Sequence, residues 1–124
     1  MILGFLLLKN NETFNILLGD NMVITIDVGN TDIVSILYDE DGNKVRHQRI
    51  SLERSKIQEN TDYFVVELIR TWHIEDVDYI VSCVVPQIAS DLKVSLNKYF
   101  NKEGTFIDYT MIDFLGEDLP YPAE

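Results

Sequence analysis

The sequence predicts an α/β domain, a mixed sheet with helices packed on it, whose elements follow the order β-β-β-α-β-α-β. Three apolar or β-branched runs come first and are separated by short turn sequences. Two stretches with apolar residues at three- and four-residue steps follow, and each is succeeded by another short apolar run. Strands joined by short turns pair antiparallel and strands joined by a helix pair parallel, so the sheet should contain both kinds of pairing.

The three leading strands are expected at Val23 to Asp27, Ile33 to Tyr38 and Lys44 to Ser51. The first is apolar on both faces, which is typical of a strand at the centre of a covered sheet. The third is polar, which indicates an edge strand or a strand that lines a site. Tight turns are predicted at Gly29-Asn30 and over residues 39–43, where Asp, Gly and Asn gather.

The second half of the chain predicts alternating helices and strands. Its elements are a loop or first helical turn over Leu52 to Asn60, a helix with Thr61 as N-cap, a strand at Asp78 to Val85, a helix beginning at Pro86 and a strand at Thr105 to Tyr109. A threonine at the N-cap accepts a hydrogen bond from the first helical turn, and proline suits the first helical position. Two crossover helices place the later strands parallel, beside the antiparallel ones.

The composition favours a single cytoplasmic domain. The chain has 124 residues, 46% hydrophobic and 25% charged, which suits one domain with one core. Its net charge of −11 repels nucleic acid and anionic membrane surfaces, so we expect neither as a partner. The only cysteine, Cys83, excludes an internal disulfide and reads as an inert core thiol among valines. Any phosphate ligand must be held locally, by backbone N–H groups, a helix N-terminus or a divalent cation.

The first 21 residues form a separate part of the chain. Their opening run, MILGFLLL, is far shorter than the roughly 20 apolar residues that cross a bilayer, and it lacks the flanks of a signal peptide. Two interpretations stay open: an added strand or short helix packed on the domain, or a start codon assigned upstream of a true start at Met22. The predicted division is residues 1–21 as an extension and 22–124 as the domain.

The chemistry concentrates where the first strand meets its turn, at Asp27-Val28-Gly29-Asn30-Thr31. A carboxylate at the end of a buried strand can hold Mg²⁺ through water. Glycine lets the backbone approach a ligand closely, and turn N–H groups with Asn and Thr side chains can donate to phosphate oxygens. The motif predicts a phosphate site, with an ordinary hairpin as the alternative. Neither GxGxxG nor GxxxxGK[ST] occurs in the chain.

Four segments carry a resemblance to a known family. They are IDVGNTDIVSILYD at Ile26 to Asp39, Arg49-Ile50-Ser51 closing the third strand, Thr61-Asp62-Tyr63 opening the first helix, and Ser82-Cys83-Val84-Val85-Pro86. With the order of elements, they resemble the N-terminal part of type III pantothenate kinase, in the actin, sugar kinase and Hsp70 superfamily. The resemblance covers Met22 to Glu124 and implies a ribonuclease H-like, actin-type ATPase lobe.

The resemblance implies ATP-dependent phosphorylation of pantothenate, in coenzyme A biosynthesis, by a homodimer. It implies ATP with Mg²⁺ and a monovalent cation, K⁺ or NH₄⁺, whose site lies outside this chain. By the same resemblance, the segment that binds the ATP phosphates comprises Asp27, Val28, Gly29, Asn30, Thr31, Asp32, Ile33 and Val34, with Asp27 also at the metal. Asp32 departs from the family, which often has asparagine there, and a carboxylate repels phosphate unless it points away or meets a cation. Tyr121 and Arg49 are candidate substrate contacts.

The catalytic base of the family lies in a Gly-x-Asp-Arg motif after a segment similar to Pro122-Ala123-Glu124, so we expect that motif beyond Glu124. The resemblance thus predicts an N-terminal fragment that does not phosphorylate pantothenate by itself, because transfer needs a base and a second lobe. Two other functions stay open: a non-catalytic, actin-like nucleotide-binding or regulatory protein, and a related kinase with another small-molecule acceptor.

Overall fold

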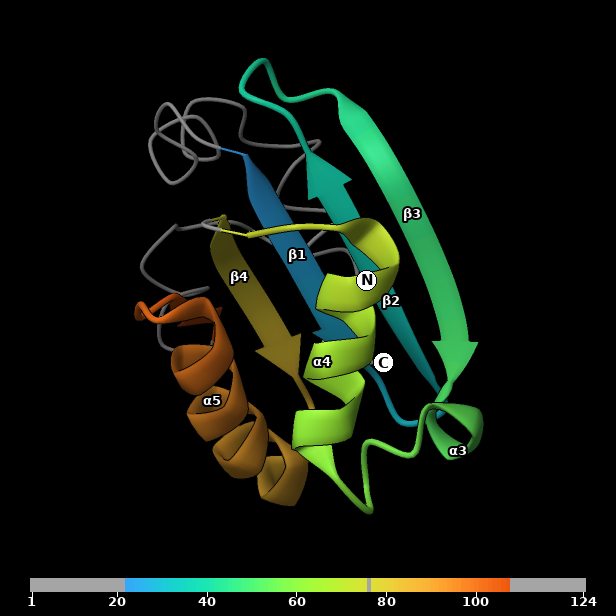
Figure 1. Cartoon of the computed structure of the whole chain (residues 1–124). Helices are drawn as coiled ribbons and strands as arrows, with labels where there is room; N and C mark the ends of the chain where they lie inside the picture. The colour runs from blue at the N-terminus through green and yellow to red at the C-terminus, as the bar shows by residue number, and fades with distance from the viewer. Residues whose placement is uncertain (1–21, 76, 108–124) are drawn as a thin grey trace, which may run out of the picture.

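The computed structural model describes residues 22–75 and 77–107, and in that part of the chain five strands form one sheet in the order β3-β2-β1-β4-β5 (Figure 1). The strands are β1 (Val23–Val28), β2 (Asp32–Tyr38), β3 (Lys44–Ser51), β4 (Asp78–Cys83) and β5 (Thr105–Ile107). β1 pairs antiparallel with β2 and β2 with β3, whereas the pairs β1–β4 and β4–β5 are parallel. The predicted mixed sheet is confirmed.

Two helices cover one face of this sheet (Figure 1). The helices of the described ranges are α3 (Leu52–Ser55), α4 (Thr61–Trp72) and α5 (Pro86–Phe100). α4 and α5 pack against each other in front of the strands in this view. α3 is a single turn directly after β3, which agrees with the helical turn that was one of the two alternatives expected over Leu52 to Asn60.

The side chains of β1 alternate between the two faces of the sheet, as the two-residue period of a strand requires. Ile24, Ile26 and Val28 belong to the main core, to which α4 contributes Leu68 and α5 contributes Leu92. Every residue of β1 is buried, as expected for the central strand. Truncating a fully buried leucine such as Leu92 to alanine costs about 2–5 kcal/mol, so this core fixes both helices on the sheet.

The opposite face of the sheet carries a second cluster of buried residues: Val23, Tyr38 and Ile80. Asp27 lies on this face, because it is four residues from Val23 along the same strand. Its register partners, Val34 of β2 and Ser82 of β4, share the face. Asp27 therefore points away from the face that α4 and α5 cover.

The N-cap of α4 differs from the prediction by one residue. Asn60, not Thr61, has the extended backbone of a cap, and its side-chain oxygen accepts a hydrogen bond from the N–H of Tyr63 at 3.1 Å. The Thr61 hydroxyl instead lies 2.7 Å from the hydroxyl of Ser95 on α5. Both residue types cap helices well, and the contact with α5 decides which of the two serves as the cap.

The ends of the last two strands also differ from the prediction. β4 ends at Cys83 instead of Val85, since the chain turns there into α5. β5 is described as far as Ile107. The expected strand end at Tyr109, the extension over residues 1–21 and the candidate Tyr121 lie outside the described residues.

Candidate phosphate-binding site

The turn between β1 and β2 is closed by one backbone hydrogen bond. The N–H of Gly29 donates to the carbonyl oxygen of Asp32 at 2.9 Å, which leaves Asn30 and Thr31 exposed at the tip. No residue of this turn has a positive φ, so glycine is not needed here for its conformation. A Cβ on Gly29 would contact only the oxygen of Asp32, at 3.4 Å, so glycine leaves this side of the turn open to a ligand.

The donors that this turn offers are the N–H groups of Asn30 and Thr31. Neither has a hydrogen-bond acceptor among residues 22–75 and 77–107, whereas the N–H of Gly29 is occupied by Asp32. Consecutive N–H groups at an exposed turn suit an anion, because each adds a directed partial positive charge. The predicted cradle therefore has two backbone donors at its tip.

Asp27 is 9% exposed at the end of β1, two residues before the turn. Its neighbour across the parallel pair is Ser82, the penultimate residue of β4. In open α/β sheets, ligands bind outside the carboxyl ends of the strands. The binding point lies where the connections that follow two neighbouring strands lead to opposite sides of the sheet. β1 leads to β2 on one side and β4 leads through α5 to β5 on the other, so Asp27 lies at such a point.

The side chains of Val28 and Ile33 are fully buried in the main core, and that of Val34 is buried on the opposite face. Within the predicted phosphate segment, the exposed groups are therefore those of the turn, and these three residues anchor it on both sides. Any contact that they make with a ligand would come from the backbone.

An ion pair neutralises the carboxylate that follows the turn. Arg49 Nη1 donates to Asp32 Oδ2 at 2.9 Å, across β2 and β3. Asp32 thus meets a cation, which is one of the two conditions under which a carboxylate is tolerated next to phosphate. Arg49 was also a candidate substrate contact, and the structure places it on the face of the sheet that carries Asp27.

The start of α3 supports the turn from the side. The N–H of Leu52 donates to the carbonyl oxygen of Thr31 at 2.7 Å. The hydroxyl of Ser51, the N-cap of α3, accepts from the N–H of Arg54 at 3.1 Å. This contact could not be predicted from the sequence, because it joins residues that only the pairing of β2 with β3 brings together.

A second set of donors lies at the start of α5. Its N-cap, Val85, supplies no side-chain acceptor, and Pro86 occupies the first turn. In the described part of the chain, the N–H groups of Gln87 and Ile88 have no acceptor outside the helix. Figure 1 shows the start of α5, the turn between β1 and β2, and α3 at the same end of the sheet. Open N–H groups and the helix dipole favour an anion at this end.

The proline directly after the apolar run of β4 signalled this helix start in the sequence. The missing cap was visible too, because Val85 precedes the proline where a polar side chain would cap the helix. The position beside the β1 turn was not visible, since it follows from the parallel pairing of β1 with β4. The N–H of Val84 donates to the carbonyl oxygen of Val28 at 3.0 Å and joins the two strand ends.

Cys83 lies at the same edge and is half-buried rather than fully buried. Its thiol donates to the carbonyl oxygen of Val85 at 3.3 Å. Burial raises the pKa of the Cys83 thiol, and the nearby negative charge of Asp27 raises it further. A thiol with a raised pKa is protonated at neutral pH, so it is a poor nucleophile, in keeping with the inert role expected for it.

The arrangement fits a nucleotide phosphate with Mg²⁺. Mg²⁺ is usually bound by one or two carboxylates together with waters and substrate phosphates, and Asp27 supplies such a carboxylate. Over residues 22–75 and 77–107, no three His, Cys, Asp or Glu side chains gather as a metal cluster, so a cation here would rely on phosphate and water for its other ligands. Within the same ranges, no helix has the length and apolarity to span a membrane.

Comparison with known proteins identifies the family. The family model described as type III pantothenate kinase matches residues 23–119 of the 124. A type III pantothenate kinase of Exiguobacterium sibiricum is 37% identical over 84 residues, which is 65% of this chain and 33% of that protein. Proteins of the same name from Roseiflexus sp. (strain RS-1) and Fusobacterium nucleatum are 28% identical over 109 residues and 35% identical over 91 residues.

These matches cover 83% and 70% of this chain, and 41% and 35% of the two relatives. The chain therefore spans about a third to two fifths of the length of the curated relatives that it matches. The matched residues include β1, the turn, both sheet-covering helices and β5. The chain belongs to the type III pantothenate kinase family.

Proposed function

We propose that this chain supplies the part of a pantothenate kinase that binds the ATP phosphates, for ATP-dependent phosphorylation of pantothenate in coenzyme A biosynthesis. The observation that carries the proposal is that three segments lie at the same end of the sheet: the end of β1 with Asp27, and the β1–β2 turn and the start of α5 with their open backbone N–H groups. The relatives named type III pantothenate kinase support the acceptor.

Each group has a role in phosphate binding. The N–H groups of Asn30 and Thr31 donate to phosphate oxygens, and the start of α5 adds a favourable dipole of about 0.3–1 kcal/mol. Asp27 would hold Mg²⁺, and the cation would screen the phosphate charge that this acidic chain otherwise repels. Arg49 keeps Asp32 neutralised beside the turn. Bound Mg²⁺ would supply electrostatic stabilisation of the transferring phosphoryl group.

The transfer itself forms a bond between the acceptor hydroxyl oxygen of pantothenate and the γ-phosphorus. The bond from that phosphorus to the β–γ bridging oxygen breaks, ADP leaves with the electron pair, and the hydroxyl proton passes to a base. The residues described here position the phosphates for this in-line displacement.

The finer features of the family are part of the same proposal. An actin-type, ribonuclease H-like lobe is supported by three antiparallel strands at one side of the sheet and two parallel strands at the other. A second lobe, a monovalent cation (K⁺ or NH₄⁺) and a homodimer are expected for the complete kinase. Cytoplasmic location is expected because the substrates ATP and pantothenate are metabolites of that compartment.

The test is ADP release by the gene product expressed from its native reading frame, with and without pantothenate. We expect release to require pantothenate, and Asp27→Asn to lower kcat/KM about a hundredfold or more. Asp41→Asn is the matched control, because it removes the same charge from the exposed turn between β2 and β3.

The other possible results of this assay distinguish the alternative functions. If ADP release requires a different acceptor, that compound is the substrate in place of pantothenate. Nucleotide binding at the turn without any ADP release would support the regulatory protein. Full activity of the Asp27→Asn variant would contradict the phosphate site.

A further inference from the structure

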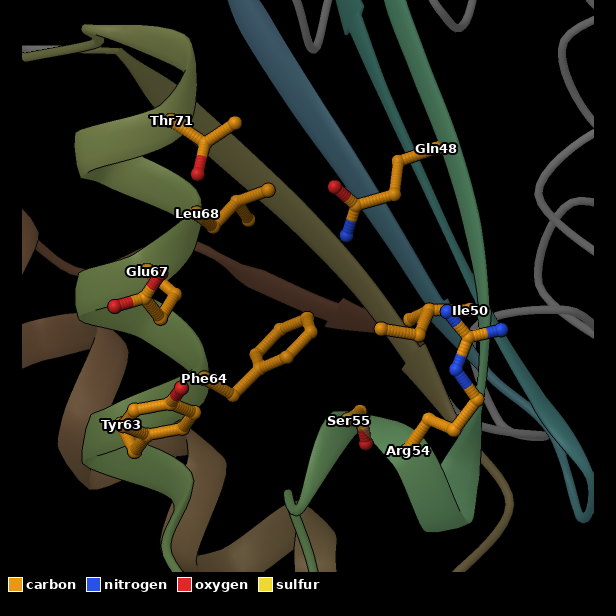
Figure 2. Close-up of a pocket in the computed structure, with 9 residues that line it drawn as sticks. All are labelled: Gln48, Ile50, Arg54, Ser55, Tyr63, Phe64, Glu67, Leu68 and Thr71. Atoms are coloured by element: carbon orange, nitrogen blue, oxygen red, sulfur yellow. The ribbon is translucent and has the colours of Figure 1, made fainter.

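A cavity of about 200 Å³ lies between β3 and α4, on the helix-covered face of the sheet (Figure 2). Its β3 wall is formed by Gln48 and Ile50, which point to the face opposite that of Arg49. Asp27 and the Asp32–Arg49 ion pair lie on the other face, so the sheet separates this cavity from these residues of the candidate phosphate site. A ligand bound here would be distinct from the nucleotide.

The floor of the cavity is apolar. Phe64 and Leu68 of α4 and Ile50 of β3 line it, and in Figure 2 the ring of Phe64 projects from α4 into the space between the two elements. Phe64 and Leu68 are almost completely buried and belong to the main core, so the floor is held rigidly. This surface suits a short hydrocarbon body.

The rim of the cavity carries hydrogen-bonding groups. Figure 2 shows the side-chain amide of Gln48 pointing from β3 towards α4, and Thr71 lies opposite on the helix. Directly beside Gln48 in the β2–β3 register is Ser35, whose side chain is fully buried. The Ser35 hydroxyl has no hydrogen-bond partner among the described residues. Ser35 does not line the cavity, so the rim groups that a ligand would reach are those of Gln48 and Thr71.

The charge of the rim favours an anion. Arg54 lines the cavity, and in the described ranges its guanidinium forms no ion pair. The only acid of the lining, Glu67, is already paired with Arg70 at 2.6 Å. A guanidinium that lies beside an apolar floor binds a carboxylate through paired, charge-assisted hydrogen bonds.

We propose that this cavity is a second ligand site, which binds a small aliphatic carboxylate with a hydroxyl or amide at its far end. Arg54 holds the carboxylate, Phe64, Leu68 and Ile50 contact the aliphatic body, and Gln48 meets the polar end. A volume of about 200 Å³ equals the liquid volume of roughly six or seven water molecules, which suits a ligand of about ten non-hydrogen atoms or fewer. The site goes beyond the proposed kinase function and does not depend on it.

The probe is 5-hydroxypentanoate, with the neutral 5-hydroxypentanamide as its matched comparison. Both are titrated into the whole chain, and binding is followed by the NMR signals of the Gln48 side-chain amide and of the α4 backbone. We expect saturable shifts with the carboxylate and binding at least about tenfold weaker with the amide, the effect of losing a charge-assisted hydrogen bond.

Two arginine variants separate the local contact from the overall charge. Arg54→Gln should weaken binding of 5-hydroxypentanoate by about tenfold or more. Arg46→Gln removes the same charge from the same face of β3, outside the cavity lining, and should leave binding unchanged. Arg54 is exposed, so its replacement leaves the fold intact.

Gln48→Met keeps the length of the side chain, removes the amide and should weaken binding as well. Followed by the shifts of the α4 backbone, this variant tests the polar end of the ligand separately. The proposal is overturned if neither probe produces saturable shifts at these residues, if the two probes bind equally, or if Arg54→Gln and Arg46→Gln have the same effect. Because the readout needs no nucleotide, its failure is distinguishable from failure of the kinase proposal.

Discussion

Arg49 Nη1 lies 2.9 Å from Asp32 Oδ2, so a cation is held against the carboxylate that directly follows the turn between β1 and β2. Both side chains are partly exposed, and such a pair contributes only about 0–1 kcal/mol to folding. Its consequence for a phosphate ligand is larger, because an unpaired carboxylate at this position would repel the ligand directly. We interpret the pair as an electrostatic support for anion binding.

A double-mutant cycle tests this interpretation. Arg49→Ala should weaken binding of MgATP several-fold, because Asp32 is then left unneutralised beside the turn. Asp32→Asn in the same chain should restore most of the lost affinity. Calorimetric titration of the four proteins gives the coupling energy. If Arg49→Ala weakens MgATP binding equally in the wild-type chain and in the Asp32→Asn chain, Arg49 contacts the ligand itself.

Gly29→Ala should separate ligand approach from folding. The added Cβ would lie 3.4 Å from the oxygen of Asp32, an ordinary contact, so the free energy of unfolding should change by less than about 0.5 kcal/mol. MgATP affinity should fall several-fold, because the methyl group occupies the side of the turn that a phosphate would approach. Urea unfolding and calorimetry on the same preparation measure both effects. An unchanged affinity would remove Gly29 from the site.

Gly104→Ala should have the opposite outcome. A Cβ at this position would lie 2.2 Å from two ring carbons of Tyr79 and 2.6 Å from its carbonyl oxygen. Tyr79 is buried against Phe100, with 5.4 Å between the ring centroids, so the ring has little room to move. We expect a loss of about 1–3 kcal/mol in the free energy of unfolding, measured in urea. Wild-type stability in this variant would refute the packing described at the start of β5.

The contact between α4 and α5 makes stability depend on pH. The Ser95 hydroxyl donates to Asp62 Oδ1 at 2.5 Å, and Lys98 Nζ lies 3.4 Å from Asp62 Oδ2. The hydrogen bond from Ser95, with the charge of Lys98, lowers the pKa of Asp62 in the folded state. The resulting stability is therefore present above the pKa of the unfolded chain, near 3.9, and is lost as the pH falls through the lower folded value.

Asp62→Asn should thus be less stable than wild type at pH 7, and the difference should shrink on acidification below about pH 4. Urea unfolding of the two proteins across this range measures it, with Asp41→Asn as the control for removal of an exposed charge. A difference that stays constant with pH would mean that the ionisation of Asp62 has no part in holding the helices together.

The sequence was sufficient for the parts of this structure that follow from local pattern. The apolar, β-branched runs of β1 and β2 and the turn residues between them predicted the hairpin and placed Asp27 at a strand end. The apolar steps of α4 and α5 predicted crossover helices, and hence parallel strands beside β1. These features depend on neighbouring residues, which is the information that a single sequence carries.

The features that the sequence did not reveal depend on tertiary pairing. Asp32 and Arg49 are 17 residues apart, and only the register of β2 with β3 brings them together. The bond from Leu52 to Thr31 follows from the same register. The choice of Asn60 over Thr61 as helix cap was equally inaccessible, because neighbouring residues with similar capping strength are distinguished only by what α5 contacts.

The central claim is that the turn after β1 binds nucleotide phosphates with the help of Asp27. The most direct measurement is an NMR titration of the 124-residue chain with MgATP, followed at the backbone amides of Asn30 and Thr31, with adenosine as the ligand that lacks phosphates. We predict saturable shifts of these amides with MgATP and none with adenosine. Asp27→Asn should weaken MgATP binding at least about tenfold, equivalent to about 1.4 kcal/mol, and Asp41→Asn should leave it unchanged. Amides that do not respond to MgATP, or equal binding by the Asp27→Asn variant, would contradict the claim.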